Sequence, residues 1–142
     1  MDTVTAPLGC PATLHIPLPS GPRAAGYARR TVTAMLGLDP ALCPPAVAED
    51  LVLIVSELAT NAVLHAEAPY ALTVGLEPGR AGIAVSDSSG GTRERRPGAD
   101  GGGGGRRSEP GGRGLRIVRA LGADLFLSRT PRGKQVIAIV TW

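Results

Sequence analysis

Hydrophobic and polar positions along the chain change period several times, which predicts an alternation of strands and helices. Residues 12–18 alternate apolar and polar side chains, as a half-buried strand does. Over residues 22–38 the apolar side chains recur near the spacing of one helical face. A long helix is predicted from about residue 46 to residue 66, because Pro44-Pro45 precedes this apolar stretch and Pro69 follows it.

The second half of the chain predicts two hairpins with a short helix between them. Four segments read as strands that pair in sequence order, residues 70–76 with 82–87 and residues 124–129 with 135–141. The helix is expected over residues 115–121, and Gly122 suits its C-terminal end. This order predicts an α+β fold.

The chain is expected to form one domain. Its 142 residues suffice to bury about two-thirds of the unfolded surface in a single core. Residues 1–11 are expected to be a flexible N-terminal segment, and residues 12–142 to be the domain. Within it, residues 88–110 hold most of the low-complexity sequence, with glycine at each of positions 101–105. A loop without packed structure is predicted there.

Composition narrows the compartment and the partners. No apolar run approaches the length of a membrane span and no signal sequence opens the chain, so a cytoplasmic protein without membrane contact is expected. The two cysteines are then expected to be reduced thiols. Zinc bound by Cys10, His15, Cys43 and His65 is conceivable, but these spacings match no usual ligand pattern.

Charge is distributed unevenly. Residues 1–92 carry four basic and eight acidic side chains, net −4, and residues 93–142 carry eleven and four, net +7, which sum to the overall +3. A basic Gly/Arg-rich loop and a pI near 9.4 are also typical of nucleic-acid binding. Residues 88–122 contain no aromatic side chain on which bases could stack. Nucleic acid is therefore an unlikely partner.

The long helix carries a polar stripe. Glu57, Asn61 and His65 follow one another at intervals of four residues, which places them on one side of a helix. Apolar runs flank them, so much of this helix should be buried, and a buried acid or amide needs a partner. The Mg²⁺ of a nucleotide is one such partner. From this motif alone, a solvated face with His65 at the helix end remains an equal alternative.

Two later segments favour a nucleotide site. Asp87 ends an alternating strand and points to the same side as Ile83 and Val85, where an acid calls for a hydrogen-bond donor. About twenty residues later, the run Gly111-Gly-Arg-Gly-Leu115 opens the short helix. A glycine-rich backbone at a helix N-terminus is a favourable site for anions.

In this order, the three segments resemble the signature of the GHKL (Bergerat-fold) ATPases, the superfamily that includes histidine kinases and gyrase. The sequence ELATNAVLHA is similar to the corresponding motif of the anti-sigma factor serine/threonine kinases and related bacterial ATP-binding regulators. The resemblance implies a two-layer sandwich of a mixed, mainly antiparallel sheet and about three helices. It also implies Glu57 as the catalytic, base-like carboxylate, Asn61 as the Mg²⁺ ligand and Asp87 as the acceptor for the adenine amino group. It implies further nucleotide-binding positions at His65, Gly91, Gly112, Arg113, Gly114 and Leu115.

The chain departs from the family pattern at two places. Ser89 stands at the first glycine position of the usual Asp-x-Gly-x-Gly motif, and Gly91 fills the second. Gln135 stands in a Gly-Lys-Gln-Val stretch where relatives often carry Thr near the base. The family places its ATP lid at the Gly/Arg-rich segment 88–110. An arginine there could meet the γ-phosphate, or the segment could be a solvated linker.

The function implied by the resemblance is an ATP-binding serine/threonine protein kinase of the anti-sigma factor type. It would transfer the γ-phosphate of Mg-ATP to a Ser or Thr of a partner antagonist protein. Its expected partners are a sigma factor, an anti-sigma factor antagonist or both, and homodimer formation stays open. An alternative is a nucleotide-gated module that sequesters a sigma factor or other regulator without catalysis. A full histidine kinase is disfavoured, because dimerisation helices and a phosphoacceptor segment would not fit in 142 residues.

Overall fold

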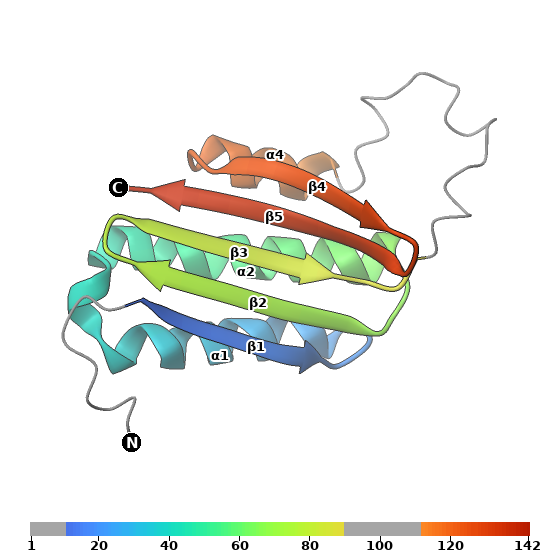
Figure 1. The fold of residues 1–142 in the computed structure, drawn as a ribbon, viewed down its shortest axis with the longest axis horizontal. Coiled ribbons are helices and arrows are strands. Elements are labelled where there is room, and N and C mark those ends of the chain that lie inside the picture. Colours follow the sequence, from blue (N-terminus) through green and yellow to red (C-terminus); the bar gives the residue numbers. More distant parts are fainter. Residues whose placement is uncertain (1–10, 90–111) are drawn as a thin grey trace.

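The fold is an α+β sandwich of one five-stranded sheet and the helices that cover one of its faces (Figure 1). The computed structural model describes residues 11–89 and 112–142, with the side chains of residues 112–114 excepted. Along the chain the elements are β1 (Ala12–Leu18), α1 (Arg23–Leu38), the 3₁₀ helix η2 (Pro40–Leu42), α2 (Pro45–His65), β2 (Tyr70–Glu77), β3 (Arg80–Ser86), α4 (Gly112–Ala120), β4 (Asp124–Thr130) and β5 (Gly133–Thr141).

The predicted fold class is confirmed, and the sheet is more regular than expected. Its strand order is β1-β2-β3-β5-β4. All four pairs of neighbouring strands are antiparallel, where the sequence also allowed a mixed sheet. Both predicted hairpins are present. Residues 1–10 and 90–111, which hold the predicted N-terminal segment and most of the predicted lid loop, lie outside the described residues.

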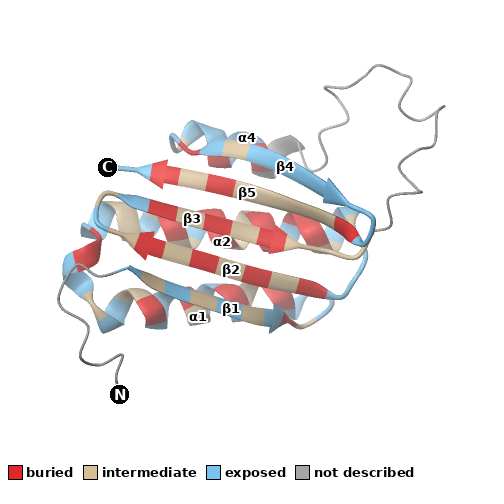
Figure 2. Cartoon of the chain, viewed as in Figure 1, coloured by how far each residue is buried: buried red, intermediate tan, exposed pale blue. Residues whose placement is uncertain are grey.

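Alternation along the strands separates a covered face from an open face. Every second residue of β2 is buried, beginning with Tyr70, and β3 follows the same pattern. The buried set faces the helices and forms the core together with β5 (Figure 2); its sheet members include Leu72, Val74, Leu76, Ala81, Ile83, Val85, Ala138 and Val140. A polar side chain on the helix-facing side of the sheet is therefore largely removed from water.

Helix α2 lies between α1 and α4 against the sheet (Figure 1). It buries seven residues, namely Leu51, Ile54, Val55, Leu58, Ala59, Asn61 and Ala62. Helix α1 contributes four buried residues at intervals of three or four, Ala24, Ala28, Val32 and Met35. Helix α4 contributes Leu115 and Val118. No helix within the described ranges is long and apolar enough to cross a membrane.

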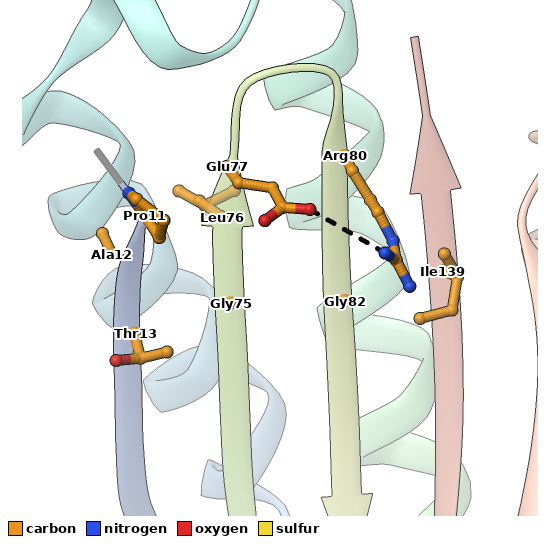
Figure 3. A pocket seen from close by; sticks show the side chains of 9 residues that line it. All are labelled: Pro11, Ala12, Thr13, Gly75, Leu76, Glu77, Arg80, Gly82 and Ile139. Atoms are coloured by element: carbon orange, nitrogen blue, oxygen red, sulfur yellow. Dashed lines mark ion pairs between the residues drawn. The ribbon is translucent and has the colours of Figure 1, made fainter. Parts of the chain in front are cut away.

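The open face of the sheet has a shallow hollow (Figure 3). Gly75 and Gly82 are directly paired there, and their neighbours on the flanking strands β1 and β5 are Thr13 and Ile139. Two adjacent residues without side chains leave a space of about 270 Å³. The hollow lies at the β2–β3 turn, at the opposite end of β3 from Asp87, so it is separate from the predicted nucleotide site.

Candidate functional site

The polar stripe of α2 has one buried member. Asn61 is 6% exposed, Glu57 is half-buried and His65, the last residue of α2, is exposed. Successive residues four apart drift by about 40° around a helix, which turns Asn61 further toward the core than Glu57. His65 would continue this drift, but the helix ends there and nothing in the described chain covers it.

Asn61 is unusual because its side-chain oxygen is buried and unpaired. Its Oδ1 has no hydrogen-bond partner among the described residues. A buried acceptor in this state costs on the order of 1–3 kcal/mol, so folding leaves a group that gains from a ligand. Amide oxygen is a suitable ligand for Mg²⁺, which keeps several waters and takes phosphate oxygens as its other ligands. Asn61 therefore fits the metal of a bound nucleotide.

The zinc alternative is not supported within the described part of the chain. Its residues contain no group of three or more His, Cys, Asp or Glu side chains able to hold a metal ion. His15 lies on the open face of the sheet, where its Nδ1 is 2.7 Å from Thr73 Oγ1. Cys43 is a buried free thiol before α2, and burial raises its pKa. Cys10 lies outside the described residues.

Asp87, directly after β3, is a buried carboxylate that already has two partners. Its side chain is 3% exposed. Lys134 Nζ lies 2.8 Å from Asp87 Oδ2 in an ion pair, and the Ser89 N–H donates to Asp87 Oδ1 at 2.8 Å. The donor required by the sequence pattern is thus supplied partly by the chain itself.

Lys134, the ion-pair partner of Asp87, was not predicted from the sequence. The register of β3 and β5 pairs Ser86 with Gln135 and Val85 with Val136. Since Val85 is buried against the helices, Gln135 faces the open side of the sheet and Lys134 faces the helical side with Asp87. Alternation counted back from Val136 would have identified Lys134.

Gly133 allows this close approach of β5 to the end of β3. A Cβ atom at position 133 would overlap the carbonyl oxygen of Asp87. The Asp87 N–H donates to the Lys134 carbonyl oxygen at 2.9 Å, which fixes the two backbones side by side. The position of the Asp87–Lys134 pair is therefore set by backbone packing as well as by charge.

Ser88 and Ser89 tie the end of β3 to the segment after α2. The Ser88 N–H donates to the Glu67 carbonyl oxygen at 2.9 Å, and the Glu67 N–H donates to Ser89 Oγ at 3.2 Å. Ser88 Oγ also donates to the carbonyl oxygens of Glu67 and Ala68. Ser89, which stands where the family motif has its first glycine, thus has a structural role: it connects the segment after Asp87 to the residues that follow α2.

Tyr70 lies in the same region and responds to its charges. Burial raises its pKa, and the negative charges of Asp87 and Glu67 raise it further. Because the folded chain favours the neutral phenol, this stabilisation is complete below the ordinary pKa near 10 and is lost as the pH rises through the raised value.

We expect Tyr70→Phe to make the unfolding free energy less dependent on pH above about pH 10. The same change removes the hydrogen bond from the Tyr70 hydroxyl to the Ala66 carbonyl oxygen, 3.1 Å long, which is worth about 0.5–1.5 kcal/mol at neutral pH. Urea unfolding of both proteins from pH 7 to 11 measures both effects. An equal decline above pH 10 in parent and variant would assign the alkaline loss to other groups.

The predicted site residues come from three segments: α2, the end of β3 and the start of α4. The C-terminal end of α2, the end of β3 and the first turn of α4 lie at the same end (Figure 1). Gly112 and Gly114 belong to that first turn, whose backbone N–H groups lack partners within the helix. Leu115 is buried in the core, so only its backbone can face a ligand. Gly91 and the side chain of Arg113 lie outside the described parts.

A comparison with family models assigns the chain to a family of ATPases. The model described as histidine kinase-like ATPase domain matches residues 18–140, which is most of the chain and includes all three segments. No curated protein matches the chain significantly. The matched range, the antiparallel sheet with its helical layer and the three polar segments agree, and the chain belongs to the histidine kinase-like ATPase family.

Proposed function

We propose that this ATPase-family domain is an ATP-dependent serine/threonine protein kinase of the anti-sigma factor type. One observation carries the proposal: the buried, unpaired Oδ1 of Asn61 lies one helical turn after the half-buried carboxylate of Glu57. An unpaired amide suits a metal ligand, and a carboxylate one turn away suits a group that acts on the attacking hydroxyl. The proposed partners are a sigma factor and its antagonist, with a Ser or Thr of the antagonist as acceptor.

Phosphoryl transfer asks mainly for positioning and charge stabilisation from the protein. Asn61 would hold Mg²⁺, which when bound neutralises charge on the phosphate oxygens. The first turn of α4 would direct backbone N–H groups at the phosphates. Glu57 would orient the acceptor hydroxyl and take its proton. These tasks would fall to groups on α2 and on the first turn of α4, two helices that pack against each other.

Base recognition would fall to Asp87. Its carboxylate is held by Ser89 and Lys134 but keeps acceptor capacity, since each carboxylate oxygen offers about two lone-pair directions. An exocyclic amino group is a suitable donor to it. Tyr70 and the Ser88–Glu67 hydrogen bonds hold the surrounding backbone.

Binding of Mg-ATP should stabilise the fold. At about 100 times the dissociation constant, a ligand that binds only the folded state adds roughly 2.7 kcal/mol, which corresponds to a rise of several degrees in melting temperature. Thermal unfolding with ATP and Mg²⁺, and again with ATP and excess EDTA, measures the increment and its metal dependence. The EDTA series should show a smaller shift, because Asn61 then lacks its metal. If millimolar Mg-ATP leaves the melting temperature unchanged, the nucleotide site is refuted.

A further inference from the structure

The Asp87–Lys134 pair offers hydrogen-bonding groups that the described residues do not use. The Asp87 carboxylate accepts two hydrogen bonds, one from Lys134 Nζ and one from the Ser89 N–H. An ammonium group has three donors, and within the described chain Lys134 Nζ donates one of them, to Asp87 Oδ2. Donors and acceptors therefore stand side by side in one desolvated unit, with side chains 12% exposed for Lys134 and 3% for Asp87.

The pair occupies a fixed position. Backbone packing of Gly133 against Asp87 and the hydrogen bond from the Asp87 N–H to Lys134 hold the two residues together. Lys134 faces the helical layer, whereas its neighbour Gln135 faces the open side of the sheet. A ligand that contacts Asp87 from the helical layer therefore meets a cationic donor next to the carboxylate.

Purine bases differ in the hydrogen-bond donors and acceptors that they present to a carboxylate–ammonium pair. Adenine presents an amino donor at position 6 beside an acceptor at N1, whereas hypoxanthine and guanine present a carbonyl acceptor at position 6 beside an N–H at N1. A carboxylate alone matches the adenine amino group but faces the 6-oxo group acceptor to acceptor. A carboxylate with an adjacent ammonium matches both kinds: the carboxylate accepts from whichever group carries hydrogen, and the ammonium donates to the other.

We propose that Lys134 is a specificity-determining residue, which reads the base together with Asp87 and admits 6-oxo purine nucleotides beside adenine nucleotides. This inference rests on the proposed nucleotide site and adds to it the class of nucleotide accepted. Lys134 acts here as a hydrogen-bond donor to the base, and its effect appears in binding without any phosphate transfer.

The test compares ATP with inosine triphosphate, which differs at position 6 of the base and leaves the sugar and phosphates the same. Calorimetric titration in the presence of Mg²⁺ should give dissociation constants within about tenfold of each other for the parent protein. In Lys134→Met the preference for ATP over inosine triphosphate should rise by at least about tenfold. Without the ammonium group, the 6-oxo oxygen has no donor beside the Asp87 carboxylate, and a buried polar group left unpaired disfavours binding strongly. Lys134→Arg, which keeps the donors, should retain most of the parent ratio.

Two controls separate this effect from loss of charge and from misfolding. Arg132→Met removes one positive charge from the same hairpin at an exposed position and should leave the ratio unchanged. If Lys134→Met does not fold, the parent ratio alone decides: rejection of inosine triphosphate by about 100-fold or more overturns the proposal. An unchanged ratio in a folded Lys134→Met protein overturns it as well, while ATP binding by the parent keeps the nucleotide site intact. If the parent binds neither nucleotide, the proposed function fails and this inference fails with it.

Discussion

Glu57→Ala is expected to lower phosphate transfer to the partner protein by about 10²- to 10⁴-fold, the usual cost of removing a general base. Affinity for Mg-ATP should change far less, because Glu57 would act on the acceptor hydroxyl and Asn61 on the metal. The half-buried position of Glu57 leaves it reachable by a partner's side chain. Transfer of labelled phosphate from ATP to candidate antagonist proteins, measured beside an ATP titration, separates the two effects.

Two further variants on α2 sharpen this experiment. Asn61→Ala should weaken binding of the Mg²⁺ complex as well as transfer, since it removes the unpaired oxygen. Thr60→Ala changes an exposed neighbour on the same helix and should leave binding and transfer unchanged. The kinase proposal fails if the parent binds ATP but phosphorylates no candidate partner and Glu57→Ala sequesters that partner equally well. The chain would then act as a nucleotide-gated binding module.

Local periodicity was sufficient to predict most of the helices and strands and both hairpins. Strands β1, β2 and β3 alternate because one face packs on helices and the other is open, and they begin and end within a few residues of their predicted bounds. The short helix η2 gives too few residues for a periodic signal. Helix α4 begins at Gly112, three residues before its predicted start, because its glycine-rich first turn carries no apolar pattern.

The positions of the candidate site residues could be predicted only where they follow local spacing. Glu57 and Asn61 share one helix, and their four-residue interval predicts their side of it. The pairing of Asp87 with Lys134 joins residues 47 positions apart, and it depends on the register between β3 and β5. The depth of Asn61 and the exposure of His65 depend on where α2 ends relative to the core, which spacing within the helix does not reveal.

Single substitutions in the Asp87–Lys134 ion pair should lower the unfolding free energy more than most other substitutions. Asp87→Leu leaves the ammonium of Lys134 buried without its partner, and Lys134→Met leaves the carboxylate in the same state. Each is expected to lower the unfolding free energy by about 3–5 kcal/mol. The double variant should recover most of this loss, because an apolar pair of similar volume replaces both desolvated charges. Urea unfolding at neutral pH of the parent, both single variants and the double variant completes the cycle.

The exposed pair Glu77–Arg80 is a matched control in the same sheet. Its atoms lie 3.8 Å apart with side chains 46% and 57% exposed, and such pairs contribute about 0–1 kcal/mol. Arg80→Met should therefore cost far less than either change at the buried pair. Losses below about 1 kcal/mol at both pairs would show that water reaches the Asp87 carboxylate in solution. A large loss at the buried pair alone would show that the Asp87 carboxylate, the proposed acceptor for the base, is already desolvated in the free protein. A desolvated carboxylate distinguishes a donor from an acceptor most strongly.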